Sequence, residues 1–256
     1  MESGVSTRPG EELSPVASRD VSEWLASDRF TIDSTRKGAK LIKSPGQRPP
    51  IAFADYCRIC NVIFSVIEDH TDAHHACICF AMIGAHLLRE HYKLNADAVS
   101  GAAAYALGQQ YKVLTFGRIE NGRLVAAPDA FHCWVECKGY VLDFLAPLFP
   151  DNLAEDRDNV ELPTRRVWMK PLAEMSPALP QRNSAAGTFQ LVSSLACKES
   201  MIRNFFKTPM SGDLREICTQ WYRRPPKTMQ AELAIRDDRF NITQLKLKAL
   251  AIQGFW

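Results

Sequence analysis

The spacing of apolar residues changes near residue 111, and this change most constrains the fold. In residues 53–67 and again in 77–92, apolar side chains recur every three or four residues, the period of a helix with a buried face. From about residue 111 the pattern becomes that of short strands, and Asn121-Gly122 supplies a tight turn between two of them. The sequence therefore predicts an α+β fold with helices packed on a mainly antiparallel sheet.

The second half of the chain is expected to extend this core. Residues 165–172 read as a further strand, whereas residues 213–224 and 240–253 have helical spacing. Thr71-Asp72 is the expected N-cap region of the helix over 77–92.

The N-terminal segment differs in composition from the remainder. Residues 1–50 contain 14 apolar residues, five prolines and four glycines. So few apolar side chains cannot offset the entropy of ordering the backbone. We interpret residues 1–50 as a loosely ordered arm and residues 51–256 as a single domain with a C-terminal helical extension.

Charge and hydropathy exclude several classes of protein. The 31 Lys and Arg residues nearly balance 29 Asp and Glu residues, which argues against a nucleic-acid partner. The first thirty residues lack the apolar core of a secretory signal, and no apolar run reaches the roughly 18 residues of a membrane span. We expect a cytoplasmic protein without a membrane partner, with its eight cysteines as reduced thiols. The sequence does not define an oligomeric state.

A histidine and an aspartate are expected to meet on one face of a hairpin. If Lys138-Gly139 forms a two-residue turn, Trp134 lies opposite Asp143 in the neighbouring strand. His132 then becomes the diagonal neighbour of Asp143 on the same face, about 7 Å away between Cβ atoms. A carboxylate at that position can orient an imidazole ring.

A cysteine is expected to lie near the same place. In the helix over 77–92, the apolar face is centred near Cys77, whereas Cys79 falls on the polar face beside His86. If the apolar face packs on the sheet, Cys77 points toward the strands and Cys79 points away. A helix N-terminus stabilises a thiolate, and a protonated histidine does so as well.

These segments together resemble the transglutaminase-like and papain-like cysteine peptidase superfamily. That superfamily shows C-x-x-[YF]-A-x-L-x-x-A-L-L-R, a V-x-G strand, H-A-W-V-E and G-W-x-x-x-D in the same order. Members include an uncharacterised bacterial domain family and, more distantly, lasso-peptide leader peptidases and arylamine N-acetyltransferases. The matching segments here are CICFAMIGAHLLR (77–89), VSG (99–101), HCWVE (132–136) and GYVLD (139–143).

The resemblance implies a papain-like, transglutaminase-like catalytic core that uses a Cys-His-Asp triad. Cys77 would be the nucleophile, His132 the general base and Asp143 the residue that orients the base. The implied activity is amide or peptide hydrolysis, or acyl transfer, through a thioester. The substrate would be a peptide or a small amide or acyl compound, with no metal and no cofactor. The chain departs from the pattern at 92–95, where YKLN replaces the usual Gly and Pro.

Three alternatives remain open at this stage. Cys79 allows a second, papain-like alignment of the nucleophile. The same scaffold also occurs in inactive binding modules, in which the triad is degenerate. A metal site could instead use His74 and His75 with the thiols at 77 and 79. Cys57 and Cys60 have the spacing of half a zinc site, but both lie on the apolar face of a helix, which favours a role in the core.

Overall fold

The computed structural model describes residues 48–155, 161–207, 210–237 and 239–256. The predicted N-terminal arm lies outside these residues except for its last three positions. The described residues belong to one compact unit. No helix in the described ranges is long and apolar enough to cross a membrane.

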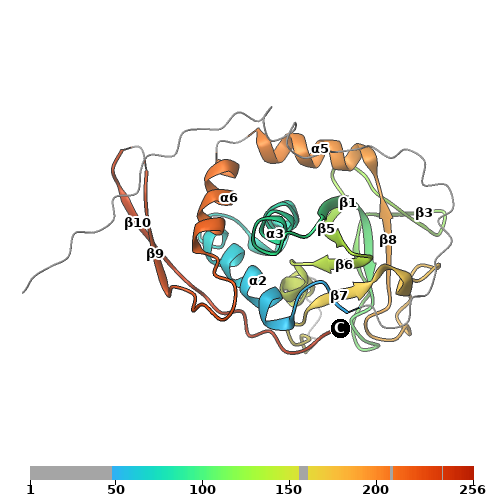
Figure 1. Cartoon of the computed structure of the whole chain (residues 1–256). Helices are drawn as coiled ribbons and strands as arrows, with labels where there is room; N and C mark the ends of the chain where they lie inside the picture. The colour runs from blue at the N-terminus through green and yellow to red at the C-terminus, as the bar shows by residue number, and fades with distance from the viewer. Residues whose placement is uncertain (1–47, 156–160, 208–209, 238) are drawn as a thin grey trace, which may run out of the picture. The chain divides into compact units, whose positions relative to one another are not determined.

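The architecture is α+β, as the change of hydrophobic period predicted (Figure 1). Antiparallel strands form the sheets, and helices pack against the largest of them. Three short 3-10 turns occur at Ala73–His75 (η1), Ala146–Leu148 (η2) and Leu172–Glu174 (η3). Within the described residues the α-helices are α2 (Phe53–Ile67), α3 (Cys77–Tyr92), α4 (Phe149–Ala154), α5 (Leu195–Phe206) and α6 (Met210–Trp221). The strands are β1 (Ala96–Tyr105), β2 (Leu114–Phe116), β3 (Arg118–Glu120), β4 (Arg123–Val125), β5 (His132–Cys137), β6 (Tyr140–Asp143), β7 (Trp168–Pro171), β8 (Phe189–Ser193), β9 (Glu232–Arg236) and β10 (Ile242–Lys246).

Helix α3 lies at the centre of this arrangement. It packs on β1 and β5 on one side and on α2 and α6 on the other (Figure 1). Because α3 is covered from both sides, most of its residues are buried, including Phe80, Ile83 and Leu87. This double burial fixes the position of the first turn of α3 against the sheet.

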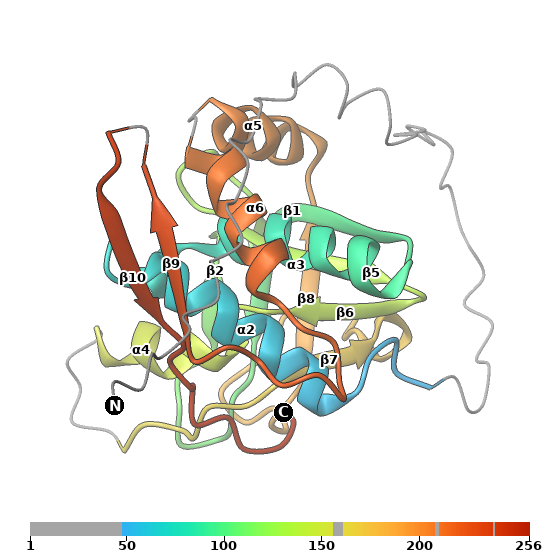
Figure 2. The same cartoon turned by 60° about the vertical axis from the view of Figure 1, so that its left-hand side comes forward.

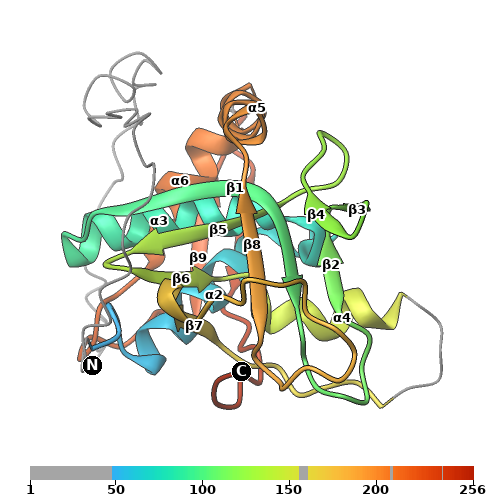
Figure 3. The same ribbon diagram turned by 90° about the vertical axis from the view of Figure 1, so that its right-hand side faces the viewer.

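The long strand β1 holds the main sheet together. Its first part, Ala96–Gly101, pairs with β5, and its last part pairs with both β2 and β8. Figure 3 shows β1 curving along the sheet, with β8 beside its second half. The chain then continues from β5 through β6 to β7, all antiparallel.

The β5–β6 hairpin has the predicted register. Cys137 pairs with Tyr140, and Val135 pairs with Leu142. Lys138 and Gly139 have φ values of 49° and 74°, as a two-residue primed turn requires. The register prediction that places His132 near Asp143 is therefore confirmed.

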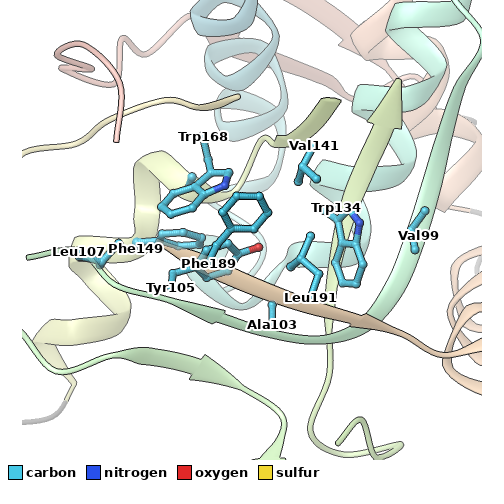
Figure 4. Packing of buried hydrophobic residues seen from close by; sticks show 11 residues of the cluster. Val99, Ala103, Tyr105, Leu107, Trp134, Val141, Phe149, Trp168, Phe189 and Leu191 are labelled. Carbon is cyan, nitrogen blue, oxygen red and sulfur yellow. The ribbon is translucent and has the colours of Figure 1, made fainter. Parts of the chain in front are cut away.

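An aromatic cluster forms the core on the sheet face that Trp134 occupies (Figure 4). Tyr105 at the end of β1 contacts Trp168 edge-on, with ring centroids 4.6 Å apart. Trp168 in turn meets Phe189 of β8 edge-on at 5.7 Å. This cluster ties β1, β7 and β8 together through side chains as well as through the backbone.

The C-terminal prediction was wrong in part. The strand over 165–172 appears as β7, and the helix over 213–224 appears as α6. Residues 240–253 are not helical, because Ile242–Lys246 is strand β10, paired with β9. The L-K-L-K run at 245–248 alternates with strand period, and the backbone partner in β9 decides between the two patterns. Figure 2 shows the β9–β10 hairpin alongside α2, which β10 contacts.

Gly101 is a position where only a glycine fits, because β8 approaches its backbone. An ideal Cβ at Gly101 would lie 2.0 Å from the carbonyl oxygen of Val192. We expect Gly101→Ala to lower the free energy of unfolding by roughly 1–3 kcal/mol or more, since a backbone atom has to move. The measurement is urea denaturation followed by circular dichroism.

The matched control for this substitution is Gly212→Ala. Gly212 lies in α6, and an added Cβ there meets nothing within 4 Å. This change should stabilise the helix by up to about 1 kcal/mol. Equal effects of the two substitutions would contradict the close approach of β8 to β1.

Candidate active site

Cys77 is the first residue of α3. The expected cap at Thr71-Asp72 was wrong, because η1 occupies 73–75 and separates Asp72 from the helix. The N-cap residue is Ala76, and no side chain within the described residues caps this end. The positive end of the helix dipole is therefore directed at the Cys77 thiol rather than at a capping side chain.

His132 and Asp143 meet at the neighbouring ends of β5 and β6. His132 is the first residue of β5, and Asp143 is the last residue of β6. The Nε2 atom of His132 lies 2.6 Å from Oδ2 of Asp143, and both side chains are fully buried. The Asp143 carboxylate therefore engages Nε2, one of the two nitrogens of the His132 ring.

The third residue, Cys77, lies against the same imidazole. The Cys77 thiol and the imidazole interact electrostatically: contact with His132 lowers the pKa of Cys77, and contact with Cys77 raises the pKa of His132. Since Asp143 occupies Nε2, Nδ1 is the nitrogen left for the sulfur, and Nδ1 makes no hydrogen bond to the described residues. The structure thus brings together the three residues singled out from the sequence, while their catalytic role stays a prediction.

Tyr105 and Tyr56 hold Asp143 in place, and the sequence analysis missed both. The hydroxyl of Tyr105 donates to Oδ2 at 2.8 Å, and the backbone N–H of Leu145 donates to Oδ1 at 3.1 Å. The hydroxyl of Tyr56 donates to the carbonyl oxygen of Asp143. These three hydrogen bonds fix both the side chain and the backbone of Asp143 in position.

Phe116 covers the imidazole ring. It comes from β2 and stacks on His132 with ring centroids 4.2 Å apart and an interplanar angle of 15°. His132 and Asp143 have no exposed surface, whereas Cys77 keeps 9% of its surface exposed. Cys77 is therefore the member of this group that keeps some solvent-exposed surface.

The titration of Cys77 and His132 favours an ion pair. A hydrogen bond with Cys133, together with contact with His132, outweighs burial and lowers the pKa of Cys77 to about 5. Burial disfavours the charged imidazole, but Asp143 and then Cys77 outweigh it and raise the pKa of His132 to about 9. Between these values the thiolate and the imidazolium coexist.

Cys79 has the opposite character. Burial, followed by the charge on Cys77, raises the pKa of Cys79 to about 11. Next to burial, the charge on Cys79 is the cause that raises the pKa of Cys218 in α6, so Cys79 lies on the α6 side of the helix. These observations favour Cys77 over Cys79 as the reactive thiol.

The histidines that could bind a metal ion are grouped with a glutamate and not with the thiols at 77 and 79. His74 and His75 both contact Oε1 of Glu155, at 2.8 and 3.1 Å, and the three side chains could hold a metal ion. The thiols at 77 and 79 are not part of this group. Cys60 is fully buried and donates its thiol hydrogen to the carbonyl oxygen of Phe144 at 3.2 Å, in keeping with a core role.

Comparisons with known proteins give a family but no activity. A family model described as "Protein of unknown function (DUF2026)" matches residues 52–256, a range that contains all three site residues. The solved structure "The crystal structure of genomics APC5867" is similar, with a TM-score of 0.71 and 29% identity. The similarity covers 83% of this chain and 100% of that one. Among curated proteins no match was found.

The first prediction from the site concerns the pH dependence of thiol alkylation. Because the pKa of Cys77 is lowered, its thiolate is present above pH about 5 and is lost as the pH falls through that value. Iodoacetamide should therefore label Cys77 at a nearly constant rate from pH 6 to 8, whereas a free thiol with pKa about 8.5 gains about tenfold per pH unit. Peptide mass spectrometry identifies the labelled residue.

The control for alkylation is His132→Ala, which removes the imidazolium. The pKa of Cys77 should rise, and labelling at pH 6 should slow. Preferential labelling of Cys79, or the same pH profile in His132→Ala, would contradict the ion pair.

The second prediction concerns the buried donor to Asp143. Tyr105→Phe removes the hydroxyl and leaves Oδ2 one hydrogen bond short. We expect a loss of about 1–3 kcal/mol in the free energy of unfolding, measured with urea. Tyr111→Phe is the matched control, since Tyr111 packs on the same core and its hydroxyl makes no hydrogen bond within the described residues. Equal losses in both variants would remove Tyr105 from the support of Asp143.

Proposed function

Since the chain belongs to the DUF2026 family, whose function is unknown, we propose its activity from the site: it is a cysteine-dependent hydrolase or acyltransferase. The substrate class is a peptide or a small amide or acyl compound. The reaction proceeds through a thioester on Cys77. The single observation that carries the proposal is the buried group of Cys77, His132 and Asp143, in which the thiol pKa is low and the imidazole pKa is high.

The first half of the reaction forms the thioester. The Cys77 sulfur attacks the carbonyl carbon, and a new C–S bond forms as the carbonyl oxygen becomes negative. The helix N-terminus, including the backbone N–H of Cys77, supplies positive charge for this oxyanion. His132 then transfers its Nδ1 proton to the leaving amine, and the C–N bond breaks.

The second half regenerates the thiolate. His132, now neutral, accepts a proton from water or from an acceptor amine as that nucleophile attacks the thioester. Water gives hydrolysis, and an amine gives acyl transfer. Asp143 keeps the Nε2 position protonated throughout, so that Nδ1 is the nitrogen that exchanges the proton with the reactants.

A papain-like, transglutaminase-like core is the finer fold that we propose. Its support is the placement of a nucleophile at a helix start, packed against an antiparallel sheet that carries the histidine and the aspartate on adjacent strands. The free state of the eight cysteines supports a reducing compartment, which we propose to be the cytoplasm.

An inactive binding module on the same scaffold is the alternative. An inactive site would not require a lowered pKa at Cys77 while burial raises the pKa of Cys79 and of Cys60. Perturbed titration of this kind, on a group with a specific charged partner, is typical of functional sites. This contrast favours the enzyme.

The test uses an activated ester, p-nitrophenyl acetate, which needs no knowledge of the natural substrate. We expect release of p-nitrophenol together with an acetyl group on Cys77, detected by peptide mass spectrometry. Cys77→Ser should abolish the acetyl adduct, and His132→Ala should slow acetylation by about 10²–10⁴-fold at pH 7.

The matched control is Cys79→Ser, two residues along the same helix, which should acetylate at the wild-type rate. Circular dichroism melting shows whether each variant is folded. Wild-type acetylation in folded Cys77→Ser or His132→Ala would overturn the mechanism. A wild-type protein that does not acetylate would favour the binding module.

A further inference from the structure

Cys133 is a second buried thiol at the site, and the proposed reaction does not use it as a nucleophile. It follows His132 in β5, at the position where the H-A-W-V-E pattern has alanine. Because side chains alternate along a strand, Cys133 points to the face opposite His132, the side on which α3 packs. It is buried to 1% exposure.

The two thiols lie in the same packing interface. Cys77 is in the first turn of α3, Cys133 is on β5, both are buried, and α3 packs on β5. Each thiol also shifts the pKa of the other. Both elements are held by regular structure, since Cys77 begins α3 and Cys133 pairs through its backbone with Ser100 of β1. A thiol and a thiolate buried in one packing interface can approach each other to form an S–S bond.

The other described cysteines nearby are placed differently. Cys79 is two residues further along α3, so the two side chains project about 200° apart around the helix. Cys60 is engaged with the carbonyl oxygen of Phe144. Cys137 lies at the far end of β5, where its backbone pairs with Ala96 and Tyr140.

We propose that Cys77 and Cys133 form a reversible disulfide when the protein meets a peroxide, and that this bond switches the site off. Cys77 is the attacking sulfur, and Cys133 is the resolving sulfur. The inference depends on a reactive thiolate at Cys77, and it holds whether or not that thiolate also cleaves amides.

The two steps balance with hydrogen peroxide as oxidant. The Cys77 thiolate attacks one peroxide oxygen, an S–O bond forms, the O–O bond breaks, and hydroxide leaves and is protonated to water. The Cys133 sulfur, losing its proton, then attacks the Cys77 sulfur; the S–S bond forms, the S–O bond breaks, and a second water leaves. Two thiols are oxidised by two electrons in total, and one peroxide is reduced to two waters.

The two thiols are suited to different parts in this sequence. The low pKa of Cys77 keeps it as the thiolate that attacks peroxide. Burial raises the pKa of Cys133 well above its usual range, so Cys133 stays protonated and does not compete for the oxidant. Once the Cys77 sulfur is oxidised, Cys133 is the neighbour in position to attack it.

The experiment treats the full chain with hydrogen peroxide and maps peptides by mass spectrometry without reduction. We expect a linked pair of peptides containing Cys77 and Cys133, loss of iodoacetamide labelling at Cys77, and complete recovery of labelling after dithiothreitol. A different cysteine pair, or sulfinic acid on Cys77 without a disulfide, would overturn the proposal.

The variants separate the switch from general oxidation. Cys133→Ser keeps a hydroxyl that can donate to Cys77 but cannot form the bond, so peroxide should drive Cys77 to sulfinic acid and dithiothreitol should restore no labelling. Cys133→Ala, the residue of the related pattern, should behave in the same way if serine disturbs the packing. Cys79→Ser should match the wild type. Recovery of labelling by dithiothreitol in both Cys133 variants would refute the switch.

The outcome is distinguishable from failure of the proposed function. A Cys77–Cys133 disulfide in a protein that does not react with p-nitrophenyl acetate supports the switch and refutes the enzyme. Acetylation of Cys77 in a protein that forms no such disulfide supports the enzyme and refutes the switch.

Discussion

The buried ion pair of His132 and Asp143 is the interaction on which the rest of the site depends. Removing a carboxylate from water costs several kcal/mol, and its partner recovers this only when the remaining lone pairs are also satisfied. Tyr105 donates to Oδ2, which His132 also contacts, and the backbone N–H of Leu145 donates to Oδ1, whereas Tyr56 holds the backbone carbonyl oxygen of the same residue. The aspartate is therefore held by elements from three parts of the chain.

The long strand β1 connects this pair to the remainder of the fold. Its first half pairs with β5 and so positions His132, while its last residue, Tyr105, donates to Asp143. Its second half also pairs with β2, which places Phe116 over the imidazole. Helix α3 packs on the same two strands and brings Cys77 to the exposed side of the group. The strand β1 thus sets the positions of the His132 imidazole, of the tyrosine that supports Asp143 and of the phenylalanine that covers the imidazole.

The errors and omissions of the sequence analysis share a physical cause. Residues 240–253 carry apolar spacing that fits a helix as well as a strand, and the hydrogen bonds to β9 decide the matter. Tyr105 is 38 residues from Asp143, and Phe116 is 16 residues from His132, so no local period points to either of them. Cys133 was visible only as the strand neighbour of His132, on the face turned away from it.

The sequence by itself determined the α+β class, the register of the β5–β6 hairpin and the phase of α3. Each depends on a short-range rule: the period of apolar residues, the geometry of a two-residue turn, and the 100° step of a helix. Those rules were enough to predict that Cys77, His132 and Asp143 lie close together. Only the tertiary structure decided that the imidazole and carboxylate are fully buried, that the pKa of the Cys77 thiol is lowered, and that Cys133 is buried in the interface between α3 and β5. The burial and the pKa of a group depend on every element packed around it, so neither can be read from one segment of the sequence.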